Sequence, residues 1–205
     1  MASLNPERRF KHPAVFVCDI QEKFRPTIYE FDKVILTTRK LLLAAKALKI
    51  PIYVTTQNRP RLGDTVAELR PLLDAAGDLV RADVDKTRFS MWLDPIASGV
   101  APQSEVVIVG IESHICVTQT ALDLLAAGHR VYILADGVSS SNREEVGVAL
   151  DRLRQAGAVV TTSESWIYEC MGDAKVPEFK EIVGVVKETM GDTRAALKSL
   201  VGSKI

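Results

Sequence analysis

The stretch VVIVGIESHICVT spans residues 106–118, and the rest of the fold can be worked out from it. An apolar run, Val106–Val109, is followed by Gly110 and by polar residues that lead to Cys116. This order is typical of a buried strand, a tight turn and the start of a helix. A thiol at a helix start faces the positive end of the helix dipole and unpaired N–H groups, which favour the thiolate. Cys116 is therefore a candidate nucleophile, although a small core residue is the commoner role of a free cysteine.

Similar apolar runs occur on both sides of this stretch and alternate with segments of helical periodicity. The other strands are expected at residues 14–18, 52–56, 79–82, 130–135 and 158–162. The helices are expected at residues 31–48, 65–73, 114–127, 143–155, 163–170 and 177–187. This alternation predicts a three-layer α/β fold with a six-stranded, mainly parallel sheet and helices on both faces. Right-handed crossovers favour the strand order 3-2-1-4-5-6.

Length and charge narrow the class of protein. The 205 residues predict a single domain, 1–205, with a core at about 13–187 and a helical or frayed tail at 188–205. The chain has 26 basic and 26 acidic residues and therefore no net charge, unlike a general nucleic-acid binder or a polybasic membrane-surface protein. It also lacks the run of about 18 apolar residues that a transmembrane helix needs. We therefore expect neither a membrane nor a nucleic acid as partner.

The cysteines indicate the compartment. Cys18, Cys116 and Cys170 are odd in number and widely spaced, and no CxxC pair occurs. This pattern is neither a disulfide framework nor a zinc site, so a reducing, cytoplasmic location is expected. The segment before Pro13 contains three basic residues but no apolar core, which leaves a mitochondrial location as the alternative.

Polar residues at the ends of the predicted strands suggest where a site would form. Asp19 ends the first strand and Cys116 follows the fourth, and these strands are neighbours in the predicted order. Ligands of such sheets bind beyond the carboxyl ends of the strands, so Asp19 and Cys116 are expected to lie close together. Lys86, after the third strand, joins them if its loop folds inward. A carboxylate accepts a thiol proton and an ammonium group stabilises both anions, although each residue taken alone also fits a capping or solvated role.

Other kinds of site find little support. The three histidines are His12, His114 and His129. His12 lies in the N-terminal tail, and His129 begins the fifth predicted strand, at the opposite end of the sheet from the expected site. His114 is two residues before Cys116, and residues two apart on a helix do not face each other. The chain has no HxH or HxxxH pattern for a metal, no GxGxxG after the first strand and no P-loop.

Three segments together resemble those of the isochorismatase-like cysteine hydrolases. They are Asp19–Gln21, Lys86–Ser90 and Gly110–Val117, and their order and spacing agree over roughly residues 13–187. A fourth segment, Gly172–Ile182, resembles the isochorismatase domain-containing subgroup of eukaryotes. The resemblance implies the predicted fold, a homo-oligomer and a small-molecule substrate.

The resemblance also implies a mechanism. Asp19, Lys86 and Cys116 would form a triad in which Cys116 attacks a carbonyl carbon and forms a thioester, Asp19 transfers the proton and Lys86 holds the charges. A cis peptide bond is implied at Ile111–Glu112. The backbone N–H groups of Glu112 and Cys116 would then form an oxyanion hole.

Departures from the family pattern guide the choice of substrate. Nicotinamidases of this superfamily bind a metal through aspartate and histidine after the second strand, but residues 57–63 contain neither, so no metal or other cofactor is expected. The isochorismatases that cleave a vinyl ether lack the cysteine, so cleavage of an amide-type C–N bond is favoured. The predicted pocket residues are Gln21, Phe24, Phe89, Met91, Trp92 and Ile115, and the apolar ones fit a core equally well.

Two other functions stay open. One is an oligomeric binding or assembly protein that keeps the fold with little turnover. The other, less favoured, is a hydrolase that acts on nucleic acid, for which Arg8, Arg9, Arg59 and Arg61 are the only basic clusters.

Overall fold

The computed structural model describes residues 8–202, and the first seven positions and the last three of the predicted tail lie outside this range. Six strands form one sheet in the order β3-β2-β1-β4-β5-β6, with every neighbouring pair parallel. The strands are β1 (Pro13–Cys18), β2 (Ile52–Gln57), β3 (Val80–Lys86), β4 (Glu105–Ile111), β5 (Arg130–Ser139) and β6 (Val159–Thr161). The predicted fold class and strand order are confirmed.

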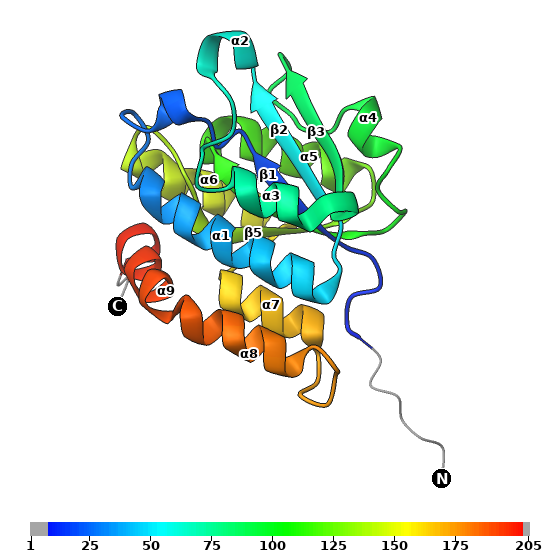
Figure 1. Cartoon of the computed structure of the whole chain (residues 1–205). Coiled ribbons are helices and arrows are strands. Elements are labelled where there is room, and N and C mark those ends of the chain that lie inside the picture. Colours follow the sequence, from blue (N-terminus) through cyan, green and yellow to red (C-terminus); the bar gives the residue numbers. More distant parts are fainter. Residues whose placement is uncertain (1–7, 203–205) are drawn as a thin grey trace.

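Alternating side chains of the strands build two cores, one on each face of the sheet. Val15 and Val17 of β1 pack into one core, whereas Ala14, Phe16 and Cys18 pack into the other. The first core is covered by α1 (Phe31–Leu48), α3 (Arg70–Ala76), α7 (Ser163–Met171), α8 (Phe179–Glu188) and α9 (Met190–Ala196). The second is covered by α4 (Asp94–Ala97), α5 (Thr118–Ala126) and α6 (Arg143–Gln155). Figure 1 shows α7, α8 and α9 grouped beside α1.

Two of the differences between the predicted and the observed elements have a cause in the sequence. The helix expected at 65–73 begins only at Arg70, because Pro71 fits the first turn of a helix and marks the start of α3. The third strand extends to Lys86 instead of ending at Ala82. As the edge strand it alternates half-buried and exposed residues, so a search for a continuous apolar run misses most of it.

The turn after β4 depends on Gly110. Its φ is 116°, and a Cβ there would lie 2.0 Å from the carbonyl oxygen of Cys18 on the neighbouring strand, so no larger residue fits. The Ile111–Glu112 peptide bond is cis, as the resemblance implied. Residues Ser113–Val117 then wind as a π-helix, in which the Val117 N–H donates to the Glu112 carbonyl at 3.2 Å. Cys116 therefore lies in a widened turn that leads into α5.

A short helix, α2 (Arg59–Leu62), follows β2. None of the helices in the described part of the chain combines the length and hydropathy needed to span a bilayer.

Candidate active site

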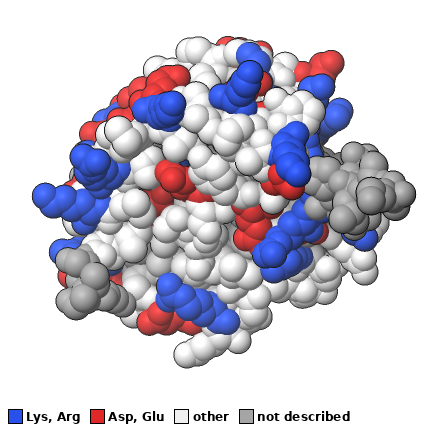
Figure 2. Space-filling model, turned by 90° about the horizontal axis from the view of Figure 1, so that it is seen from below, with Lys and Arg blue, Asp and Glu red and all other residues white. Residues whose placement is uncertain are grey.

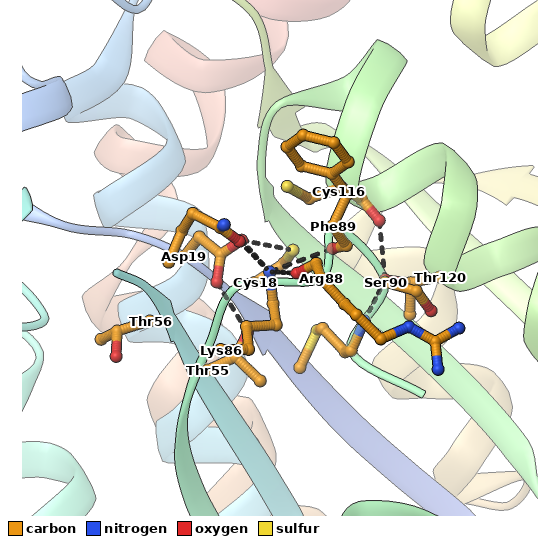
Figure 3. A network of polar contacts seen from close by, with 12 residues as sticks. Cys18, Asp19, Thr55, Thr56, Lys86, Arg88, Phe89, Ser90, Cys116 and Thr120 are labelled. Atoms are coloured by element: carbon orange, nitrogen blue, oxygen red, sulfur yellow. Dashed lines mark hydrogen bonds and ion pairs between the residues drawn. The ribbon is translucent and has the colours of Figure 1, made fainter. Parts of the chain in front are cut away.

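Asp19 lies directly after the carboxyl end of β1. Its φ of 53° is in the left-handed region, which aspartate tolerates better than most residues, and its side chain is 1% exposed. Oδ1 accepts a hydrogen bond from the Thr55 hydroxyl at 2.8 Å. Oδ2 accepts one from Lys86 Nζ at 2.7 Å and a longer one from the Cys18 thiol at 3.7 Å. A buried carboxylate thus faces a cation and a thiol (Figure 3).

Lys86 is the last residue of β3, and its ammonium group is turned inward. Besides Asp19, Nζ donates to Gln57 Oε1 at 2.8 Å and to the backbone carbonyls of Arg88 and Phe89 at 3.1 and 3.0 Å. Burial alone lowers the pKa of Lys86, but charge on Cys18, Asp19 and Cys116 and the hydrogen bond to Asp19 raise it above the ordinary lysine value. The loop after β3 folds back over the lysine, which keeps a charged group in a dry site.

Cys116 enters the same region from the π-helical turn. Its carbonyl accepts a hydrogen bond from the Thr120 hydroxyl at 2.6 Å, and that hydroxyl accepts one from the Met91 N–H at 2.9 Å. These contacts tie the turn to the loop after β3. The thiol belongs to the same apolar core as Cys18, whose pKa is raised by burial first and then by the neighbouring Cys116. The structure therefore brings Asp19, Lys86 and Cys116 into one cluster (Figure 3).

The side chains of Glu112 and His114 point away from this cluster. Glu112 Oε2 accepts the N–H of Ser141 at 2.8 Å, so only the backbone of Glu112 is available to the site. His114 Nδ1 lies 3.0 Å from the hydroxyl of Ser140, the residue that follows β5.

The six predicted pocket residues are spread over several environments. Gln21 is fully buried and its side chain bonds the backbone of Gln57 and Gly63, so it joins the ends of β1 and β2. Phe24 packs against the core on the α1 face. Trp92 packs edge-on to His129 at a ring-centroid distance of 5.0 Å, next to the first residue of β5 and away from the carboxyl ends. These three side chains therefore have structural contacts of their own.

The other three residues lie on the α5 face. Met91 is fully buried in the core that contains Cys116, and Ile115 packs against the same core. Phe89 is 50% exposed and lines a cavity of about 330 Å³ between the loop after β3 and α5. The remaining lining residues are Thr87, Arg88, Ser90, Gln119, Leu122 and Asp123.

Sequence reasoning missed three residues in this network. Thr55 and Gln57 hold Asp19 and Lys86, and Cys18 contacts Asp19. The signal was present, because β2 neighbours β1 in the predicted order and its polar end, Thr55–Gln57, had to lie at the same edge of the sheet. Within residues 8–202, no three His, Cys, Asp or Glu side chains form a group able to hold a metal ion.

Comparison with known proteins places this chain in a family. Residues 13–165 match the isochorismatase domain. The chain belongs to the isochorismatase family. It is 41% identical to the "Secreted isochorismatase effector Isc1" of Phytophthora sojae, over 88% of each chain. It is 38% identical to "Isochorismatase domain-containing protein 2" of Xenopus laevis, over 87% of this chain and 85% of the relative.

Solved structures extend the comparison. The "MAR1 Ribonuclease" of Caenorhabditis elegans is 39% identical, with a TM-score of 0.79 over 86% of this chain and 90% of its own. The YcaC gene product of Escherichia coli, described as an octameric hydrolase of unknown specificity, has a TM-score of 0.77 over 94% of each chain. Its identity of 22% supports the fold alone. Family membership supports assignment of this chain as a hydrolase.

Proposed function

We propose that the protein is a cysteine hydrolase that cleaves an amide-type C–N bond of a small molecule. The observation that carries the proposal is the buried Asp19–Lys86 ion pair, 2.7 Å long, next to the Cys116 thiol. A carboxylate and an ammonium group held in a dry site beside a thiol supply a proton acceptor and a source of charge stabilisation.

The reaction would run in two stages. Cys116 Sγ attacks the carbonyl carbon and Asp19 accepts the thiol proton. The N–H groups of Glu112 and Cys116 stabilise the oxyanion. Asp19 then protonates the leaving amine as the C–N bond breaks and the thioester forms. In the second stage water attacks the thioester, Asp19 accepts its proton, and the carboxylic acid leaves as the thiol is restored.

The proposed pocket contains fewer of the predicted residues than the sequence suggested. Phe89, Met91 and Ile115 lie beside the cluster and are retained as candidates for substrate contact. Gln21, Phe24 and Trp92 are omitted, because each is held by contacts elsewhere. The proposed reaction needs no metal, and the homo-oligomer implied by the resemblance stays a prediction. Light scattering measures the size of the assembly.

The first test is selective alkylation of the thiols. Near neutral pH, iodoacetamide should label Cys116 faster than Cys18 and Cys170, because Cys116 lies at a helix start beside a cation and is the most exposed of the three, at 7% against 0% and 3%. Mass spectrometry of digested peptides measures the three rates. Equal, slow labelling of all three would contradict the proposed nucleophile.

The second test is a panel of small amides and esters. Hydrolysis that disappears in Cys116→Ala and persists in Cys170→Ala supports the proposal. If no member of the panel is hydrolysed in a Cys116-dependent way, the binding or assembly function is favoured instead.

A second candidate is cleavage of RNA, because the Caenorhabditis elegans structure with 39% identity is called a ribonuclease. The charges of this chain argue against it. Arg59 bonds Asp83 at 2.7 Å and lies 3.7 Å from Asp64, which neutralises one member of its basic cluster. Figure 2 shows basic and acidic side chains interspersed on the face in view rather than gathered into one basic patch. Incubation of single-stranded RNA with the protein and with Cys116→Ala decides between the two substrates.

A further inference from the structure

Cys18 is a buried thiol that the proposed hydrolysis does not use. It is the last residue of β1 and is 0% exposed. Because side chains alternate along a strand, Cys18 points to the same face as α5, the helix that begins after Cys116. Both cysteines belong to the same apolar core, whereas Cys170 lies in α7 and belongs to the core on the opposite face.

Backbone geometry brings the two thiols together. Cys18 pairs with Gly110, and the missing Cβ of Gly110 lets β4 approach the Cys18 carbonyl closely. The turn that follows carries Cys116 back over the end of β1. Both thiols belong to the core on the α5 face, and the presence of Cys116 is among the causes that raise the pKa of Cys18, after burial. Figure 3 shows Cys18 and Lys86 joined to Asp19, with the Cys116 side chain close to them.

The surroundings of the pair differ in a way that suits two successive roles. Cys116 is 7% exposed and lies at the helix start, so a small oxidant reaches it first. Cys18 is covered, and its thiol already donates to Asp19 Oδ2 at 3.7 Å. Asp19 can therefore accept the Cys18 proton at the moment when Cys18 reacts.

We infer that Cys18 and Cys116 form an oxidative modification site, in which a small hydroperoxide oxidises Cys116 and Cys18 resolves the product to a disulfide. In the first step the Cys116 sulfur displaces one oxygen of the peroxide. The O–O bond breaks, an S–O bond forms, and hydrogen peroxide is reduced to water while Cys116 becomes a sulfenic acid. In the second step the Cys18 sulfur attacks the Cys116 sulfur. The S–S bond forms, the S–O bond breaks, and hydroxide leaves as water with the Cys18 proton, relayed through Asp19.

Such a disulfide would block the candidate nucleophile reversibly. It would also protect Cys116 from further oxidation to sulfinic acid, which thiol reductants do not reverse. The inference goes beyond the proposed hydrolysis and needs no substrate.

The test is peptide mapping after treatment with hydrogen peroxide. The protein is treated, denatured, alkylated and digested without reductant. We expect a Cys18–Cys116 crosslinked peptide as the main product and an intact mass lower by two hydrogen atoms. Dithiothreitol should remove the crosslink and return the mass to that of the untreated protein. Cys170→Ala, which also removes a buried thiol, should behave as the wild type.

Cys18→Ala should give a different product. Without the resolving thiol, Cys116 should gain oxygen atoms that dithiothreitol does not remove. Circular dichroism checks that this variant is folded, and Cys18→Ser is used if it is not. The inference is overturned if wild-type Cys116 gains oxygen as fast as in Cys18→Ala, if the crosslink joins Cys170, or if peroxide leaves Cys116 unchanged. A crosslink in a protein that hydrolyses no amide removes the proposed function and leaves this inference standing.

Discussion

Two aspartates are equally buried in this molecule and differ in what surrounds them. Asp19 and Asp136 are 1% and 0% exposed, and each follows an apolar run in a central strand. Asp136 accepts the backbone N–H of Ser163 at 2.8 Å and also its hydroxyl, so it caps the start of α7. Asp19 instead faces an ammonium group and a thiol. The Asp136 carboxylate holds two elements together, whereas the Asp19 carboxylate has neighbours with which it can exchange a proton.

Each aspartate also has a buried lysine nearby, and here the contrast sharpens. Lys86 contacts Asp19 directly, and its pKa is raised. Lys40 is 1% exposed and donates to the Thr193 hydroxyl at 2.8 Å, but within residues 8–202 it forms no ion pair. Burial lowers the pKa of Lys40, although the charges of Asp136, Glu164 and Asp192 act in the opposite direction. Residue type and burial therefore do not identify a reactive site, whereas direct contact between the charged groups beside a thiol does.

The largest expected effect separates the two aspartates. Asp19→Asn should lower Cys116-dependent hydrolysis by about 10²–10⁴-fold, because the amide cannot accept the thiol proton. Asp136→Asn should change the rate by less than about threefold and instead lower the free energy of unfolding by about 1–3 kcal/mol, through the weakened cap. Initial rates on a substrate from the amide panel and urea unfolding measure the two effects. A similar loss of activity in both variants would remove the distinction.

How far the sequence predicts this difference can be judged from the two strands. The apolar runs before Asp19 and Asp136 predict two buried strands with a carboxylate at or near their ends, and the sheet order places Asp19 beside the turn of Cys116. The partners are harder to predict, because they come from other elements. Ser163 contacts Asp136 from a helix start 27 residues away. Lys86 contacts Asp19 from an edge strand, and the alternating burial of that strand made its end at Lys86 difficult to predict.

Pocket residues show the same limit. Met91 and Trp92 are adjacent in sequence, yet Met91 is buried with Cys116 in one core while Trp92 packs on His129. Sequence position places both after the third strand, but a loop reverses direction from one residue to the next. Only packing decides which side chain faces the site.

The next effect concerns the two lysines and should have opposite signs. Lys86→Met leaves Asp19 buried without its cation and should lower the free energy of unfolding by about 3–5 kcal/mol. Lys40→Met removes a poorly paired buried ammonium group and should raise it by about 1 kcal/mol. Urea unfolding of both variants at neutral pH measures the pair. Methionine replaces most of the apolar stem of lysine and removes the charge, and the same substitution is made at both sites, so each variant controls for the other.

Alkylation extends the same comparison to the site. Labelling of Cys116 should slow in Lys86→Met, because the cation that stabilises the thiolate is lost, and should be unchanged in Lys40→Met. Two destabilised variants, or unchanged labelling in both, would show that the lysines are equivalent.

The smallest effect is the pH dependence that the two lysines impart to stability. Lys40 has a folded pKa below its unfolded value, so folding carries the cost of the buried charge at low pH. This cost begins to fall as pH passes the folded pKa and is gone above the unfolded pKa of about 10.5. Lys86 has a folded pKa above its unfolded value, so its contribution is complete below about pH 10.5 and is lost only as pH rises through the folded pKa. As pH rises toward about 10.5, the stability advantage of Lys40→Met over wild type should therefore shrink, whereas the deficit of Lys86→Met should stay nearly constant. Urea midpoints of the three proteins across this range measure both trends. A constant advantage for Lys40→Met would mean that Asp136, Glu164 and Asp192 hold the charge of Lys40 as firmly as Asp19 holds that of Lys86.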